Sequence, residues 1–295
     1  MPDNSANRAR YHQRLQRVIN HINANLDDAL DLDALAEVAC LSRFHWHRVY
    51  RGLTGETIHA TVKRLKLNRA SQQLKGGASL EKIARDAGYS SETAFGRAFK
   101  AQMGHSPAGF RASPDTAPSP AILKLESFAT RLQTENLAVS IRSLPARQLA
   151  VLHQTGPYNG STVFAKLLRA AQAQGLPCQP IFGLSYDDPA LVPPEAVRSA
   201  AGVEISPATT PSTPLEILEI PATRFAIFAY RGPNERLGLA YDWIFSHWLP
   251  GSGEAPANQP ALNIYYNNPR TTAPEDLRTD ICIPLMERPH HARKT

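Results

Sequence analysis

Two shortages in this sequence exclude whole classes of protein. Only three of its 295 residues are cysteine, and no Cys-x-x-Cys pair occurs, so neither a disulfide framework nor a zinc site is expected. Each cysteine has apolar neighbours, which predicts buried free thiols at Cys40, Cys178 and Cys282. No stretch of about 18 uncharged apolar residues occurs, and the first residues lack the pattern of a secretory leader. We therefore expect a cytoplasmic protein.

Positive charge is concentrated in the first third of the chain. Residues 1–112 hold 17 Lys and Arg against 10 Asp and Glu, whereas residues 113–295 hold 15 against 16. A basic domain followed by a near-neutral one suggests a polyanion-binding module joined to a part with another role.

A cluster of prolines separates the two parts. Pro114, Pro118 and Pro120 lie close together, and proline fixes φ and lacks an amide donor, so the chain there should be extended. The chain is long enough for two domains, each with its own core. The expected divisions are a first domain, a linker, a second domain and a tail, at residues 1–112, 113–136, 137–288 and 289–295.

The first domain contains a helical repeat. The stretch LDALAEVACLSRFHWHRVYRGLTG, which starts at Leu32, resembles LEKIARDAGYSSETAFGRAFKAQMG, which starts at Leu80. In each copy apolar residues recur at helical spacing, a short break follows, and a second helix should begin at a serine suited to N-capping. Small residues such as Ala36 and Ala84 allow two short helices to cross closely. The pattern predicts an all-α domain with two helix-turn-helix motifs.

The outward face of the second helix in such a motif enters the major groove of DNA. In the second copy, Tyr89, Phe95 and Phe99 should hold that helix in place. Its outward residues are Ser91, Glu92, Thr93, Gly96 and Arg97, and the equivalent face of the first copy offers Phe44, His45, His47 and Arg48. One such face is more often simply solvated, but two tandem copies in the basic third of the chain favour DNA.

The spacing between the copies supports DNA binding. The stretch from Thr57 to Lys75 is expected to form one helix. A helix of this length spans about 28 Å, and successive major grooves on one face of B-DNA lie about 34 Å apart. A rigid connector could hold two reading helices against two successive major grooves of double-stranded DNA, with some bending of the DNA.

These features resemble the DNA-binding domain of AraC/XylS-type transcription regulators, over about residues 11–112. The most specific part is SSETAFGRAFKAQMGHSPAGFR. The resemblance implies base contacts at Phe44, His47, Arg48, Glu92, Thr93, Gly96 and Arg97. Bidentate binding of arginine to guanine is the commonest specific contact, so Arg48 and Arg97 are the leading base readers. His47 and Gly96 replace longer polar residues of some relatives, so the operator sequence is not implied.

The second domain also repeats itself, at a shift of 76 residues. LPARQLAVLHQTGPYN, from Leu144, matches IPATRFAIFAYRGPNE, from Ile220. Each copy should form a strand, a Gly-Pro turn, a helix and further strands. The pattern predicts an α+β domain of two pseudo-symmetric β-α-β-β repeats, with a groove between them that suits a small ligand.

This half, over about residues 137–288, is similar to the GyrI-like effector-binding domain. The resemblance implies an aromatic-lined groove for a small, often lipophilic cation, at Tyr158, Tyr230, Trp243 and Tyr265. For any one of these rings, an ordinary core position is about equally expected. Asn263 stands where many family members have a glutamate, and it keeps hydrogen-bonding ability without the charge. A neutral polar or aromatic effector is therefore favoured over a cation.

No enzyme signature competes with this interpretation. The imidazoles of His45 and His47 point apart on a helix at their i, i+2 spacing, and no phosphate loop, nucleophile elbow or metal motif occurs. No cofactor is expected. We interpret the chain as a sequence-specific DNA-binding regulator whose second domain senses a small molecule. Two alternatives stay open for that domain: a small-molecule hydrolase or ligand-sequestering domain, and a docking site for a protein such as RNA polymerase.

Overall fold

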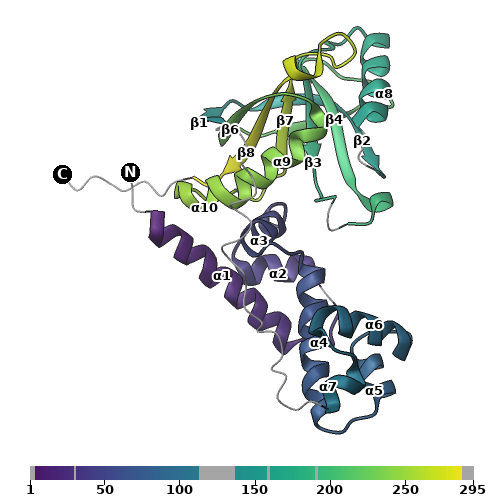
Figure 1. The fold of residues 1–295 in the computed structure, drawn as a ribbon. Helices are drawn as coiled ribbons and strands as arrows, with labels where there is room; N and C mark the ends of the chain where they lie inside the picture. Colours follow the sequence, from purple (N-terminus) through teal and green to yellow (C-terminus); the bar gives the residue numbers. More distant parts are fainter. Residues whose placement is uncertain (1–3, 30, 113–136, 158–159, 190–191, 288–295) are drawn as a thin grey trace, which may run out of the picture.

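The chain folds into a series of helices followed by a curved antiparallel sheet that carries further helices (Figure 1). The computed structural model describes residues 4–29, 31–112, 137–157, 160–189 and 192–287. The expected linker at 113–136 and tail at 289–295 lie outside these ranges. Within them, no helix is long and apolar enough to cross a membrane.

The N-terminal part is helical, as predicted. Its helices are α1 (Asn4–Ala24), α2 (Leu32–Ala39), α3 (Trp46–Thr54), α4 (Ile58–Lys75), α5 (Leu80–Asp86), α6 (Glu92–Met103) and α7 (Pro107–Ala112). The two helix-turn-helix motifs are α2–α3 and α5–α6, and the unbroken α4 joins them. Thr57 caps α4, because its hydroxyl oxygen accepts a hydrogen bond of 3.2 Å from the Ala60 amide.

The first reading helix starts later than predicted. The serine that should cap it, Ser42, is instead followed by a turn, and α3 begins only at Trp46. The Ser42 hydroxyl accepts from the Phe44 amide within that turn. In the second motif the prediction is confirmed, since Ser91 caps α6 through a 3.2 Å hydrogen bond from the Ala94 amide.

The C-terminal part forms one eight-stranded antiparallel sheet in the order β1-β6-β8-β7-β3-β4-β2-β5. The strands are β1 (Ala138–Leu144), β2 (Arg147–Thr155), β3 (Ile181–Ser185), β4 (Arg198–Ile205), β5 (Glu216–Ile220), β6 (Thr223–Arg231), β7 (Ala261–Tyr265) and β8 (Arg278–Leu285). Helix α8 (Gly160–Ala173) follows β2, and α9 (Leu237–Trp243) follows β6 and continues through a π-helical turn, Ile244–Trp248, into α10 (Leu249–Ser252).

The predicted repeat is confirmed and each copy is longer by one strand. Each unit is β-β-α-β-β, and its first strand pairs with the other unit: β1 pairs with β6, and β5 pairs with β2. The Gly-Pro turns also correspond, because Gly156 and Gly232 both have positive φ, which favours glycine. The pairing of β1 with β6 and of β5 with β2 joins the two units into one sheet.

The hydrophobic core does not divide where the two parts of the sequence divide. One core cluster contains Leu15 and Val49 from the N-terminal helices together with Phe228 and Phe245 from the C-terminal part. Helices α5 to α7 and the second half of α4 form a separate core around Phe95 and Phe99. The first motif is therefore packed on the C-terminal domain, whereas the second motif lies at the far end of the molecule (Figure 1).

The cysteines differ in burial, and the prediction of three buried thiols is confirmed for only one of them. Cys282 is buried and Cys178 half-buried, but Cys40 is exposed. Cys40 ends α2 in the left-handed conformation with φ of 52°, so it lies in the turn of the motif and outside its core.

Candidate DNA-reading faces and effector groove

The predicted DNA-reading face of α6 is open to solvent. Phe95 and Phe99 are fully buried, and the Tyr89 ring packs edge-on against Phe95 at 5.7 Å. These contacts turn the opposite side of α6 outward, and its residues Ser91, Glu92, Thr93 and Arg97 are exposed. A Cβ added at Gly96 would meet nothing within 4 Å, so the main chain itself is accessible there.

The corresponding face of α3 is covered by the C-terminal domain. His45 is only 2% exposed. Its Nε2 lies 2.9 Å from the carbonyl oxygen of Gln259, and its ring stacks on Phe245 at 5.4 Å. Burial lowers the pKa of His45 to about 3, with the nearby positive charge of Arg48 as a smaller cause. The imidazole is therefore neutral at pH 7.

His47 and Arg48 also lie against the C-terminal domain. His47 is buried, and its Nε2 lies 3.6 Å from Asp188 Oδ2. Burial lowers the pKa of His47 to about 4, against an opposing effect of Asp188. The guanidinium of Arg48 lies over the Tyr241 ring, 4.4 Å from its centre.

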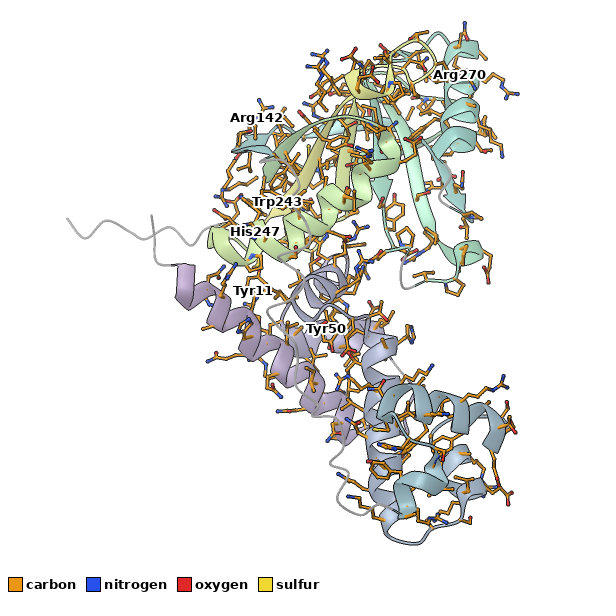
Figure 2. All side chains as sticks on the ribbon, in the orientation of Figure 1. Tyr11, Tyr50, Arg142, Trp243, His247 and Arg270 are labelled. Carbon is orange, nitrogen blue, oxygen red and sulfur yellow. The ribbon has the colours of Figure 1, made fainter. Side chains whose placement is uncertain are left out.

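The interface extends one turn further along α3. Arg51 forms an ion pair with Asp242 on α9, and its other terminal nitrogen lies 3.9 Å from Asp188. Gly52 packs directly on the π-helical turn: a Cβ at this position would lie 2.9 Å from the Cα of Ser246. At the other end of the interface, Tyr11 of α1 donates to the carbonyl oxygen of Glu254 (Figure 2).

Sequence reasoning missed the residues of the C-terminal domain that cover α3. The stretch Asp187-Asp188-Pro189 corresponds, in the second repeat, to Asn267-Asn268-Pro269. The local geometry is the same in both, since Asp187 accepts from the Arg198 amide and Asn267 accepts from the Arg278 amide. The difference in charge was the available signal, because only the acidic copy faces α3.

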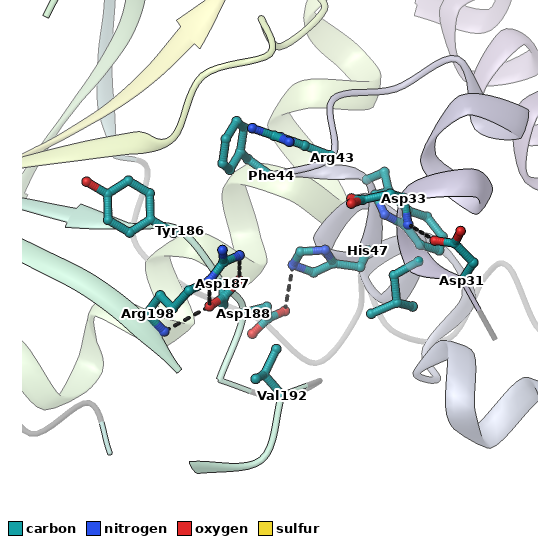
Figure 3. Close-up of a pocket in the computed structure, with 12 residues that line it drawn as sticks. Asp31, Asp33, Arg43, Phe44, His47, Tyr186, Asp187, Asp188, Val192 and Arg198 are labelled. Atoms are coloured by element: carbon teal, nitrogen blue, oxygen red, sulfur yellow. Dashed lines mark hydrogen bonds and ion pairs between the residues drawn. The ribbon is translucent and has the colours of Figure 1, made fainter. Parts of the chain in front are cut away.

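A cleft of about 700 Å³ opens beside this interface (Figure 3). On the α2–α3 side it is lined by Phe44, whose ring carries the Arg43 guanidinium at 4.8 Å. On the opposite side the Asp187 carboxylate pairs with Arg198 at 2.7 Å. His47 points across the cleft toward Asp188. The other residues that line the cleft are Asp31, Leu32, Asp33, Trp46, Tyr186 and Val192.

The predicted effector residues lie on the face of the sheet that carries the helices, except Tyr158, which is outside the described residues. Asn263 is buried at the centre of this face, on β7. Its Oδ1 accepts a 2.9 Å hydrogen bond from the Tyr241 hydroxyl, and its Nδ2 donates to the Tyr265 hydroxyl at 3.3 Å. The Tyr265 ring packs edge-on against Phe164 of α8 at 5.3 Å. These side chains form a continuous packed layer from α8 to α9 at the position of the predicted groove, and we call this layer the effector groove after that prediction.

Two predicted aromatic residues lie beside this layer. Trp243 is half-buried on α9 and packs edge-on against Phe228 at 6.4 Å (Figure 2). Tyr230 donates its hydroxyl hydrogen to the carbonyl oxygen of Pro233, in the Gly-Pro turn. Among the residues described, no group of His, Cys, Asp and Glu could hold a metal ion.

Two family profiles match the chain, one in each half. Residues 137–286 match the family profile described as the GyrI-like small molecule binding domain, and residues 35–113 match one described as a helix-turn-helix domain. The probable transcriptional regulator YgiV of Escherichia coli K12 is 30% identical over 156 residues, which cover 50% of this chain and 96% of YgiV.

Two further matches cover one domain each. The HTH-type transcriptional regulator AlkR of Acinetobacter baylyi is 34% identical over 101 residues, or 34% of this chain and 33% of AlkR. The crystal structure of the EcmrR C-terminal domain aligns with a TM-score of 0.43 and 13% identity, over 52% of this chain and 99% of that structure. The chain belongs to the GyrI-like small-molecule-binding family, with an AraC-type helix-turn-helix domain before that domain, and is a DNA-binding transcription regulator with an effector-binding domain.

Proposed function

We propose that this regulator recognises double-stranded DNA by placing α6 in the major groove, with Arg97 as its principal base reader. The observation that carries the proposal is the open face of α6. Arg97 and Thr93 are exposed, and nothing within 4 Å would meet a side chain at Gly96, so a base edge or phosphate could approach the helix backbone closely. Ser91 and Glu92 lie at the same end of the helix, where the first residues of a reading helix contact bases.

The connector supports a second contact with DNA. Helix α4 has 18 residues without a break, which corresponds to about 27 Å. We place Phe44, His45, His47 and Arg48 against a second major groove when α3 is not covered. The site would then consist of two short blocks about one helical turn apart.

Substitution of Arg97 tests the contact made by α6. Arg97→Ala should weaken binding to a DNA fragment selected by the full chain by about 1–3 kcal/mol and relax one base position. Arg270→Ala removes the same charge from an exposed position on the C-terminal domain, far from the N-terminal helices (Figure 2), and should change affinity little. An equal loss on specific and nonspecific DNA would make Arg97 a phosphate contact and contradict the proposal.

The effector in this proposal is a neutral polar or aromatic molecule bound in the effector groove, at Tyr158, Tyr230, Trp243, Asn263 and Tyr265. Asn263 supports this choice because its amide supplies an acceptor oxygen and two donor hydrogens, and no charge, at the centre of the groove. Thermal shifts of the full chain should single out neutral aromatics from a library that also contains their amine analogues. A ligand at 100 times its dissociation constant adds about 2.7 kcal/mol of stability. Preferential stabilisation by the amines would contradict a neutral effector.

The effector domain acts in this proposal as a sensor and does not hydrolyse its ligand. An asparagine such as Asn263 has no proton that titrates near neutral pH, so it suits neither a general acid nor a general base. A turnover screen with reactive esters, repeated on Asn263→Ala, tests this. Turnover that depends on Asn263 would establish the hydrolase alternative.

We place the regulator in the cytoplasm, where it meets DNA, with domains at 1–112 and 137–288. Its protein partner at a promoter is RNA polymerase. In vitro transcription from a promoter that carries the selected site, with and without the protein, tests for an effect on RNA polymerase. It also shows whether the protein activates or represses transcription. An unchanged transcript level despite full occupancy of the site would contradict it.

A further inference from the structure

The two reading helices can be compared residue by residue. At a shift of 49, residues Glu92, Thr93, Gly96, Arg97 and Lys100 of the second motif correspond to Arg43, Phe44, His47, Arg48 and Arg51 of the first. The face on α6 is open, whereas on α3 three of its members contact the C-terminal domain: His47 near Asp188, Arg48 on Tyr241, and Arg51 with Asp242. Equivalent faces of α3 and α6 thus have different environments: the face on α3 is covered and the face on α6 is open.

The surface that covers α3 has the chemistry of a DNA substitute. Asp188 and Asp242 present carboxylates to Arg51, as phosphates would. Tyr241 presents a flat ring to the Arg48 guanidinium, which also stacks on bases. Because the same side chains that would contact DNA make these contacts, α3 cannot bind the effector domain and a major groove at the same time.

The acidic residue at the centre of this surface is not required by the fold. The pseudo-symmetric position of Asp188 is Asn268, and both follow an Asp or Asn that accepts a hydrogen bond from the main-chain amide of an arginine. Asp188 is buried against α3, whereas Asn268 is half-buried away from it. The carboxylate therefore occurs in the one repeat where a basic helix covers it.

Tyr241 connects this surface to the effector groove. Its ring carries Arg48, and its hydroxyl donates to Asn263. Its ring is also parallel to Phe245, which in turn stacks on His45 of the first motif. A ligand that competes for the Asn263 amide would displace the Tyr241 hydroxyl, and with it the ring on which Arg48 lies.

We propose that the effector domain holds α3 in a closed arrangement in which only α6 can read DNA, and that a ligand at Asn263 acts through Tyr241 to release α3. This inference rests on the proposed function, since it concerns when the two reading helices are available. The effector domain and the second major groove compete for one surface, so the bound state of one excludes the other.

Gly52 provides a substitution that acts on the closed arrangement alone. A methyl group there would lie 2.9 Å from both Cα and Cβ of Ser246, and a main-chain atom cannot rotate away. The equivalent residue of the second motif is Ala101, so a reading helix accepts alanine at this position. Gly238→Ala is the matched control, because Gly238 is a helical glycine of α9 with nothing within 4 Å of its added Cβ.

A hydroxyl-radical footprint of the full chain on a selected DNA fragment, without ligand, tests the proposal. The wild type and Gly238→Ala should protect one block, and Gly52→Ala should protect two. The double variant Asp188→Asn with Asp242→Asn should give the same second block, with Asp276→Asn as its control, because Asp276 pairs with the exposed Arg231. If the closed form makes up about 90% of the wild type, release raises the affinity of the two-block complex about tenfold.

Each other outcome overturns either the closed arrangement or the proposed function. Two protected blocks with the wild type, or one block with both sets of opening variants, would overturn the closed arrangement while leaving DNA recognition by α6 intact. Absence of any specific block with every chain would instead overturn the proposed function, and the inference with it.

Discussion

The guanidinium of Arg48 lies 4.4 Å from the centre of the Tyr241 ring, and these two residues come from the two halves of the chain. Arg48 is the predicted base reader of the first motif. Tyr241 belongs to α9, and its hydroxyl group donates a hydrogen bond to Asn263 in the effector groove. Tyr241 thus joins the predicted DNA-reading residue Arg48 to Asn263, the residue expected to meet the effector.

The Tyr241 hydroxyl should matter for stability. Tyr241→Phe keeps the ring beneath Arg48 but leaves Asn263 Oδ1, which is buried, without this donor. We expect the free energy of unfolding in urea to fall by about 1–3 kcal/mol. Tyr266→Phe removes the hydroxyl bond to Asp280 at a more exposed position and should cost less, so equal losses would contradict the role of Asn263.

Acid should destabilise the protein through His45. Burial lowers its pKa from 6.5 to about 3, so below about pH 6.5 the unfolded chain takes up a proton that the folded chain does not. The stability is therefore fully present above that pH and is lost as the pH falls toward 3. The loss is about 1.4 kcal/mol per pH unit within this window. His47, whose pKa burial also lowers, should add to the slope of the wild type. Urea unfolding between pH 7 and 5 should therefore show a slope that is larger in the wild type than in His45→Gln by up to this amount; identical slopes would contradict the burial of His45.

The thiols should react at different rates. Burial raises the pKa of Cys282 to about 12, so this thiol should resist a thiol reagent at pH 8 until the chain unfolds. Cys40 is exposed and should react in the folded protein. Mass spectrometry of briefly labelled native protein measures both, with Cys40→Ser as the control. Labelling of Cys282 in the native state would contradict its placement inside the sheet core.

Much of the fold was predictable because it depends on local patterns. The repeat at 76 residues predicted both Gly-Pro turns and both helices of the effector domain, and Thr57 to Lys75 was correctly predicted as one helix. The extra strands β1 and β5 were not predicted. Each pairs with a strand of the other repeat, and the sequence of β1 or β5 alone does not indicate that partner.

The covering of α3 was not predictable from α3 itself. Its sequence has the same helix period and the same arginine as α6, so the two faces look alike. The two faces differ in what covers them: Asp188, Tyr241 and Asp242 lie against α3, and they are at least 134 residues further along the chain. Only the difference between Asp187-Asp188 and Asn267-Asn268 carried information about that contact.

The most direct measurement is genomic site selection with the full chain in the absence of ligand, repeated with Arg97→Ala and with Arg48→Ala. If α6 reads DNA while α3 is covered, the wild type should enrich one short conserved block, Arg97→Ala should lose it, and Arg48→Ala should retain it. A block that survives Arg97→Ala and disappears with Arg48→Ala would show that α3 is the reading helix of the free protein and contradict the account.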